Sequence, residues 1–256
     1  MLGAVVAAAL ALAASPGTAA KQTVAEITAF RARPAGSAAE RRVQGLVSRR
    51  LESFGYTVTS EAFALPRGGN SRNVVGTSAG VPRVVVLAHA DGVRGTSAAN
   101  DNASGVAVLL ELAHALRGRP GVVVAALGAE ERIETGSRYH LGSAAFVRSL
   151  SGSERRAIRF AVSLDMVGVG TRLRVRGIEA RPNRSARLLI PATSYLRDRL
   201  GQSDHAELTR AGIPAAWLQW REDRCWHGSC DTVARVRVAN LQAAYDATFA
   251  AAKAAL

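Results

Sequence analysis

Hydrophobic and polar positions divide the 256-residue chain into segments of two different periods. Short unbroken apolar runs predict buried strands, because a strand covered on both faces has no polar side. These runs occupy residues 83–88, 121–127, 159–164 and 214–220. Residues 56–65 alternate between polar and apolar side chains and predict a half-exposed strand, and Asn73–Thr77 begins its partner after a turn at 67–70.

Segments with helical spacing lie between these strands. Apolar residues recur on one face over residues 37–54, before Gly55, and over residues 104–116, where we expect Ser104 to cap the start. Residues 23–30, 183–200 and 238–256 are also predicted to be helical. Strands that alternate with helices predict an α/β fold: a single domain of three αβα layers with a central, mostly parallel sheet.

The N-terminal segment has the pattern of an export signal. Residues 2–14 are continuously apolar and small, and the turn-forming residues 15–17 and small residues follow before Lys21. The run is too short to span a bilayer, which takes about 20 residues, but an apolar core, a break and small residues at a cleavage site are typical of a secretory signal peptide. We expect residues 1–20 to be a signal peptide and residues 21–256 to be the secreted domain, with no membrane segment after cleavage. An uncleaved N-terminal anchor is the alternative.

The chain carries a net charge of +13, almost all of it from arginine, since Lys21 and Lys253 are the only lysines. A basic chain can bind nucleic acid, anionic lipid or acidic polymers. No basic run is interleaved with aromatic residues, as a nucleic-acid groove would require. We therefore expect a generally basic surface and no nucleic-acid partner.

Candidate metal ligands recur along the chain, mostly where an apolar run ends and a polar turn begins. In chain order they are His89, Asp101, the pair Glu130-Glu131, Asp165 and His227. In open α/β sheets, ligands collect beyond the carboxyl ends of the strands. Neutral imidazoles and ionised carboxylates brought to one point are the ligands that zinc requires. The ordered set predicts a two-zinc hydrolase.

The spacing inside each motif suggests a division of labour. His89 and Asp91 point the same way in an extended segment, so Asp91 can accept a hydrogen bond from the ring or hold the local loop. The carboxylate of Asp101, in a polar turn before a helix, can place one oxygen on each of two metals. In the pair Glu130-Glu131, one carboxylate can bind zinc while the other stays free to act as a base on water.

The remaining motifs add a carboxylate and an imidazole. Asp165 follows a buried strand, where an unpaired carboxylate is costly and a metal would remove that cost. Cys225 and Cys230 flank His227, and in an exported protein a close pair predicts a disulfide that fixes the loop carrying the histidine. Metal binding by both thiols is the alternative.

Other polar residues are weaker candidates. Asp204 and His205 could line the pocket, and a structural hydrogen-bonding role is equally compatible with the sequence. His114 and His140 fall in segments that we expect to be helical, and we predict that neither binds metal.

Taken together, the motifs resemble those of the secreted bacterial two-zinc aminopeptidases, metallopeptidase family twenty-eight. The resemblance runs from about residue 83 to residue 233. The segments that carry it are VVVLAHAD, AANDNASGVAVLLELA, LGAEE followed by GS, SLDMVG, SDHAELTRAGIPA and CWHGSCDT. It implies a zinc-exopeptidase-like α/β fold with a mixed sheet, two zinc ions per chain, and release of N-terminal residues from peptides.

The resemblance also implies roles for the individual residues. His89 and Asp165 would hold one zinc, and Glu131 and His227 the other. Asp101 would bridge both ions. Glu130 would be the general base that passes a proton from the bridging water to the leaving amine. Trp226 stands where relatives often carry a tyrosine that supports the oxyanion, and its indole N–H is the donor available for that purpose here.

The sequence therefore predicts a secreted, monomeric metallo-aminopeptidase that acts on peptides with a free N-terminus. A glutaminyl cyclase or a carboxypeptidase on the same scaffold is the alternative enzyme. A binding protein that has lost its metals and holds anionic cell-wall polymer is the alternative outside the enzymes.

Overall fold

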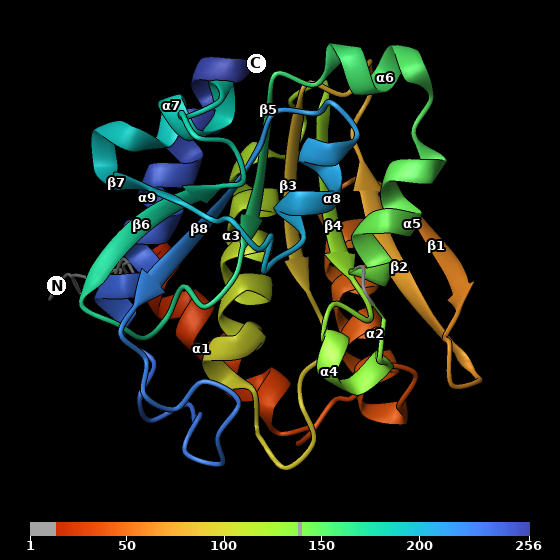
Figure 1. Cartoon of the computed structure of the whole chain (residues 1–256), viewed down its shortest axis with the longest axis vertical. Helices are drawn as coiled ribbons and strands as arrows, with labels where there is room; N and C mark the ends of the chain where they lie inside the picture. Colours follow the sequence, from red (N-terminus) through yellow and green to blue (C-terminus); the bar gives the residue numbers. More distant parts are fainter. Residues whose placement is uncertain (1–13, 138–139) are drawn as a thin grey trace, which may run out of the picture.

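The computed structural model describes residues 14–137 and 140–256, which form a mixed eight-stranded sheet between helices (Figure 1). The strands are β1 (Thr57–Ala64), β2 (Asn70–Thr77), β3 (Val84–His89), β4 (Val122–Leu127), β5 (Phe160–Leu164), β6 (Arg172–Gly177), β7 (Ser194–Arg197) and β8 (Ala215–Arg221). The α-helices are α1 (Pro16–Thr28), α2 (Ala38–Ser53), α3 (Ser104–Leu116), α4 (Arg132–Thr135), α5 (Leu141–Ser149), α6 (Gly152–Ala157), α7 (Arg184–Leu189), α8 (His205–Arg210) and α9 (Val238–Ala255). Two short helical turns of other types, η1 (Ala99–Ala103) and η2 (Ile190–Ala192), complete the set.

The strand order across the sheet is β1-β2-β4-β3-β5-β8-β6-β7. The four central strands β4, β3, β5 and β8 are parallel, whereas β2 joins β4 and β6 joins β8 in antiparallel pairs. This arrangement confirms the predicted α/β fold with a mixed sheet. Because the central strands are parallel, the carboxyl ends of β3, β4 and β5 meet at one edge of the sheet, which is where binding residues collect in such folds.

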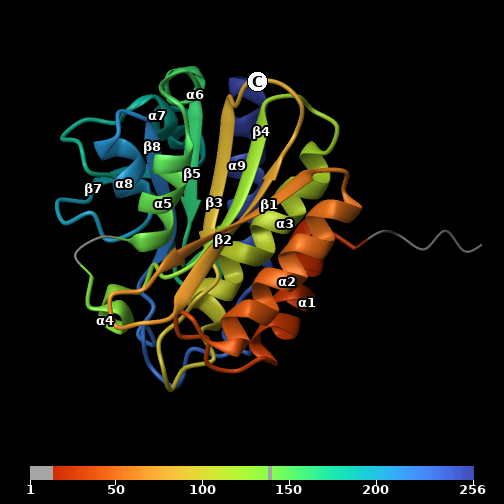
Figure 2. The same cartoon turned by 90° about the vertical axis from the view of Figure 1, so that its right-hand side faces the viewer.

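Two hydrophobic cores lie on opposite faces of the sheet. One core joins alternate residues of the central strands to α1, α2, α3, α7 and α9. The other joins the intervening residues to α5 and α8. Val84 and Val86 point into the first core and Val85 and Leu87 into the second, so β3 has no polar side. Figure 2 shows α2 and α3 on one side of the sheet and α5 and α8 on the other.

Most of the predicted elements are present with bounds within a few residues of those expected. The helix predicted over residues 23–30 begins earlier, at Pro16, and no bounds were predicted for helices α4, α5 and α6. The helix predicted over residues 183–200 is wrong in its second half: it ends at Leu189, and residues 194–197 form edge strand β7. Strand β6 was not predicted, although its alternating arginines and apolar residues are typical of a strand. Ser104 does not cap α3; its hydroxyl donates to the Asn100 carbonyl, and the Asn102 side chain accepts the Gly105 N–H instead.

The N-terminal residues of the described chain pack against the fold. Helix α1 contacts α3 and α9 and buries Ala20, Val24 and Ile27. The Gly17 N–H donates to Gln242 of α9 at 2.8 Å. Most of the apolar run at residues 2–14 lies outside the described residues, and the proposed boundary at residue 20 stays a prediction. Within the described part of the chain, no helix has the length and apolar character needed to cross a membrane.

Gly105 allows α3 to approach the end of β5. A Cβ at this position would lie 2.1 Å from the Leu164 carbonyl oxygen and 2.4 Å from Asn102 Oδ1. Neither atom can move without disturbing the polar turn before α3 or the residue that follows β5. A side chain at residue 105 would therefore separate two segments that carry predicted metal ligands.

We expect Gly105→Ala to lower the free energy of unfolding by about 3 kcal/mol, because the added methyl group overpacks a backbone contact. Gly45→Ala is the matched control. Gly45 lies inside α2, where a Cβ meets only the end of the Arg49 side chain at 3.4 Å. The control should gain about 0.5–1 kcal/mol from helix propensity. Urea unfolding of both variants measures the difference, and equal stabilities would contradict the proposed contact.

Candidate metal centre

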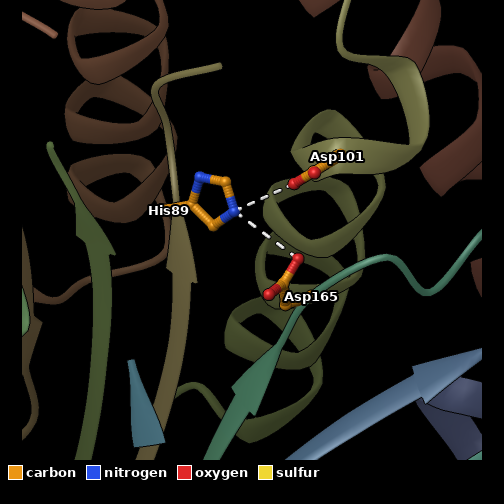
Figure 3. Close-up of side chains that lie close together, drawn as sticks. All are labelled: His89, Asp101 and Asp165. Atoms are coloured by element: carbon orange, nitrogen blue, oxygen red, sulfur yellow. Dashed lines mark ion pairs between the residues drawn. The ribbon is translucent and has the colours of Figure 1, made fainter. Parts of the chain in front are cut away.

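The structure brings the predicted ligands together at the carboxyl edge of the parallel strands. His89 ends β3, Glu130 and Glu131 follow β4, and Asp165 follows β5. Asp101 comes from η1, directly before α3, and His227 from the loop after β8. Figure 3 shows the His89 ring pointing toward the carboxylates of Asp101 and Asp165. Five separate segments therefore supply one cluster of side chains.

Asp101 stands between two groups of ligand atoms. Its Oδ1 lies 3.2 Å from His89 Nε2, which is also 3.5 Å from Asp165 Oδ1. Its Oδ2 lies 3.3 Å from His227 Nε2, which is 3.1 Å from Glu131 Oε2. Each group of three offers ligand atoms within 4.8 Å of one another. The two oxygens of one carboxylate thus face two different imidazoles, as a bridging ligand requires.

Two buried carboxylates hold the backbone that carries these ligands. Asp91 accepts the backbone N–H groups of Glu130 and Glu131, both at 3.1 Å. Asp231 accepts the N–H groups of Asn100 and Asp101 at 2.7 and 3.1 Å. Of the two roles predicted for Asp91, the structure shows that it holds a loop, and its Oδ1 also lies 3.5 Å from His89 Nδ1.

A buried arginine holds the loop between β3 and η1. Arg33 is fully buried and donates to the carbonyl oxygens of Ala90, Ser97 and Ala98 at 3.1, 2.8 and 2.9 Å. Burial lowers the pKa of Arg33 to about 10, against the opposing effect of nearby carboxylates that begins with Asp91. At neutral pH this side chain is therefore a cation. It offsets part of the negative charge of the cluster while fixing the loop between β3 and η1.

The ionisation of the cluster reflects its crowding. Burial raises the pKa of Glu131 to about 7, and the charge of Asp101 adds to this rise. Burial also raises the pKa of Glu130 well above its usual value. Burial alone would lower the pKa of His227, but hydrogen bonds to Asp101 and Glu131 raise it to about 10. In the metal-free chain, protons on the imidazoles therefore balance the carboxylates, and a metal must displace them.

The loop that carries His227 is closed by a disulfide between Cys225 and Cys230, whose Cα atoms are 5.3 Å apart. The predicted disulfide is present, so neither thiol is left to bind a metal. The Trp226 ring lies 4.3 Å from the His227 ring and is 54% exposed. Asp231, which holds Asp101, lies directly after Cys230. The disulfide therefore closes a loop that contains His227 and ends next to Asp231, the residue that holds the backbone of Asp101.

The cluster opens into a cavity of about 520 Å³. One end is lined by the ligand candidates and by Glu130, which is only 6% exposed. The other end is lined mainly by residues of β6 and β8, among them Arg176, Trp217 and Gln219.

Sequence reasoning left several residues of the site unassigned. Asp231 stands in the segment CWHGSCDT with no sequence signal for its contact with Asp101, and Arg33 had no local signal at all. His140 is not among the grouped ligand candidates of the described residues. Its Nε2 lies 3.4 Å from Glu130 Oε1, and its Nδ1 lies 3.5 Å from Glu207 Oε1. It precedes α5 rather than lying inside a helix. A histidine next to an expected helix start carries no sequence mark of this contact.

Asp204 and His205 are fully buried and do not line the cavity. Burial lowers the pKa of His205 to about 3, so the ring is neutral. Its Nε2 lies 3.5 Å from Asp198 Oδ2. The pocket-lining role that the sequence left open is therefore not seen, and the side-chain oxygens of Asp204 and the ring nitrogens of His205 have no hydrogen-bond partner among the described residues.

The donor set fits zinc by its chemistry and by its unmet hydrogen bonds. His89 Nε2, Glu131 Oε1 and Asp165 Oδ1 are buried and have no hydrogen-bond partner among the described residues. Buried polar atoms are normally paired, and atoms left unpaired in a cluster of imidazoles and carboxylates are what metal ligation would satisfy. Each half of the site offers one imidazole nitrogen, one carboxylate of its own and a share of Asp101.

Comparison with known proteins agrees with this geometry. The family model described as Peptidase family M28 matches residues 73–252. Aminopeptidase YwaD of Bacillus subtilis is 32% identical over 187 residues, covering 66% of this chain and 40% of the relative. Leupeptin-inactivating enzyme 1 of Streptomyces exfoliatus is 28% identical over 228 residues, covering 74% and 49%. The chain thus spans less than half the length of both relatives.

Solved structures share the fold at low sequence identity. A zinc aminopeptidase from Bacillus subtilis superposes with a TM-score of 0.84 at 19% identity, covering 92% of this chain and 93% of the other. A glutaminyl cyclase from Porphyromonas gingivalis gives a TM-score of 0.81 at 20% identity, covering 94% and 98%. These similarities establish the fold, which is shared by two different activities.

We expect zinc to raise the thermal midpoint of the wild-type chain. A site filled at a hundred times its Kd contributes about 2.7 kcal/mol, or roughly 5–10 °C for a domain of this size. The increase should be smaller at pH 6 than at pH 8, because the pKa of His227 is raised and protons compete with the metal at the lower pH. Asp101→Asn should lose most of the increase, since this carboxylate faces both groups.

Asp246→Asn, an exposed change on α9, is the matched control and should respond to zinc as the wild type does. Differential scanning calorimetry with and without zinc gives the midpoints. A full zinc response in Asp101→Asn would show that Asp101 is not shared between two ions.

We expect the double variant Cys225→Ser, Cys230→Ser to lose about 2 kcal/mol of stability, the chain-entropy value for so short a loop. It should also bind zinc more weakly than the wild type, since both His227 and Asp231 lie in the affected segment. Zinc titration of the folded variant measures this, with alkylation of the wild type confirming that no thiol is free. Unchanged zinc affinity would mean that the disulfide does not support the site.

Proposed function

The chain belongs to peptidase family M28, and on that premise we propose that it is a zinc-dependent aminopeptidase that removes N-terminal residues from peptides. The observation that carries the proposal is the position of Asp101, whose two oxygens lie 3.2 and 3.3 Å from the Nε2 atoms of His89 and His227. A carboxylate shared in this way supports two metal ions rather than one.

In this proposal His89, Asp165 and Asp101 hold one zinc ion, and Glu131, His227 and Asp101 hold the other. Bound zinc lowers the pKa of water toward about 7 and polarises a carbonyl group. The buried backbone contacts of Asp91 and Asp231 keep the ligand carboxylates in place before substrate arrives. Such preorganisation removes the cost of rearranging the site during the reaction.

Glu130 is the proposed general base. It adjoins Glu131 in sequence, lines the cavity and has a carboxylate oxygen within 4.8 Å of ligand atoms of His89 and Glu131. Its surroundings favour the protonated form, so it can hold a proton taken from water and deliver it to the leaving amine. His140 on its far side, 3.4 Å from Oε1, limits the directions in which the carboxylate can turn.

Trp226 is the proposed donor to the developing oxyanion. Its ring stacks at an angle on His227 at the cavity wall, and its indole N–H has no acceptor among the described residues. The half-exposed ring can therefore reorient when a peptide enters. The substrate would contact it where the cavity meets solvent.

The disulfide is compatible with an extracellular enzyme. A disulfide next to the metal centre is stable in an oxidising compartment. We propose that residues 1–20 direct secretion and that the domain from residue 21 acts on extracellular peptides.

We expect Glu130→Gln to bind two equivalents of zinc and to lower kcat by about 10²-fold or more, because the amide keeps the shape of the side chain but cannot accept the proton. Metal analysis by mass spectrometry and hydrolysis of leucine para-nitroanilide, with and without a chelator, provide the two measurements. Glu52→Gln, an exposed change on α2, is the control and should retain full activity.

Full activity in Glu130→Gln would remove this residue from the role of base. One zinc per wild-type chain, together with cyclisation of N-terminal glutamine and no release of leucine, would instead assign the chain to the glutaminyl cyclases that share the fold.

A further inference from the structure

The lining of the same cavity includes a buried arginine that the proposed chemistry does not use. Arg176 lies on β6, is 9% exposed, and lines the same cavity as Asp101, Glu131 and His227. Its guanidinium carbon is 4.2 Å from the centre of the Trp217 ring. The Trp217 indole in turn donates to the backbone oxygen of Asp165 at 3.0 Å. A single side chain therefore separates Arg176 from a proposed zinc ligand.

The guanidinium is held in place with donors to spare. Nη1 donates to Gln219 Oε1 at 3.1 Å, and Nη2 donates to Gln202 Oε1 at 2.9 Å and to Asp198 at 3.4 Å. An arginine has five N–H donors, so these three bonds leave two without an acceptor among the described residues. Nε is one of them and is buried.

The charge of Arg176 is incompletely balanced. Burial lowers its pKa, the nearby Asp198 raises it and Arg221 lowers it again. Its one carboxylate within ion-pair distance, Asp198 at 3.4 Å, also accepts the backbone N–H of Gln202 at 2.7 Å. A buried cation that shares its nearest counterion gains from a further anion.

The other charged residues at this end of the cavity do not supply that anion. Asp223 pairs with Arg235 at 3.0 Å, and Glu222 pairs with Arg172 at 3.0 Å. Arg221 also lines the cavity, and its side chain has no ion pair within the described part of the chain. Both acids are thus paired with arginines that do not line the cavity, whereas Arg176 and Arg221 do line it.

We propose that Arg176, supported by Trp217, Gln202 and Gln219, forms a subsite that binds a carboxylate of the substrate. The carboxylate comes either from an acidic side chain on the N-terminal residue or from the C-terminus of a very short peptide. This proposal rests on the proposed aminopeptidase function, since it names the substrate class of the same cavity. It makes Arg176 a specificity residue and gives it no part in bond cleavage.

Arg176→Gln tests the subsite, and Arg174→Gln is the matched control. Arg174 lies two residues earlier on the same face of β6, carries the same charge and does not line the cavity. The side-chain source is tested by comparing the para-nitroanilides of glutamate and glutamine. The main-chain source is tested by comparing Leu-Gly with its C-terminal amide.

In the wild type and in Arg174→Gln, we expect kcat/KM to favour the carboxylate over its neutral partner by at least about tenfold in one of the two comparisons. In Arg176→Gln that ratio should fall to about 1, through KM, while the hydrolysis of leucine para-nitroanilide and the zinc content are retained. Arg176→Lys should recover part of the ratio. The comparison in which the ratio falls identifies the source of the carboxylate.

Ratios near 1 in the wild type, or ratios unchanged in Arg176→Gln, would overturn the proposal while leaving aminopeptidase activity intact. Calorimetric binding of glutamate against glutamine, and of Leu-Gly against its C-terminal amide to the Glu130→Gln variant, measures the same preferences without turnover. The subsite is therefore tested even if the chain cleaves no peptide, in which case the proposed function fails separately. Thermal midpoints show whether Arg176→Gln is folded, and Arg176→Lys carries the test if it is not.

Discussion

The density of buried negative charge at the carboxyl edge of the sheet is the constraint on which the site depends. Seven carboxylates of this region are buried: Asp91, Asp101, Glu130, Glu131, Asp165, Asp204 and Asp231. Carboxylates removed from water repel one another and lose hydration, which costs several kcal/mol per ion unless each is paired. The described chain offsets the charge with the imidazoles of His89 and His227 and with the buried cation of Arg33. Two divalent cations would complete the balance, so the same charge that strains the metal-free fold provides the affinity for metal.

Precision in this cluster comes from backbone contacts rather than from the ligands themselves. Asp91, two residues after His89, accepts hydrogen bonds from the backbone that follows β4. Asp231, four residues after His227, accepts hydrogen bonds from the backbone that precedes α3. The segment that carries each histidine therefore also carries an aspartate, and that aspartate holds the backbone of a carboxylate ligand from another segment. Gly105 completes the arrangement, because only a residue without Cβ lets α3 reach the end of β5.

The cavity is lined by two chemically different groups of residues, the ligand candidates and the residues around Arg176. Trp217 connects them, since it donates to the Asp165 backbone and stacks on the Arg176 guanidinium. The antiparallel pairing of β6 with β8 sets Arg176 opposite Trp217 in register. Strand β6 carries no ligand candidate, yet through Arg176 it lines the space that a substrate would fill beside the metals.

The sequence by itself determined the central strands and the identity of the candidate ligands. Runs such as residues 83–88 are apolar throughout because both faces of the strand are buried, and the polar residues that follow them must gather where parallel strands end. It did not mark β7 or the break after Leu189, because a short edge strand buries too little apolar surface to leave a pattern.

Tertiary structure alone decided the parts played by Arg33, His140, Asp231 and Arg176. Each contacts groups distant in the chain, at separations of up to 134 residues in the case of Asp231 and Ser97. A hydrogen bond between such groups depends on how the elements pack against one another, and a single polar contact of this kind leaves no periodic pattern in the local sequence.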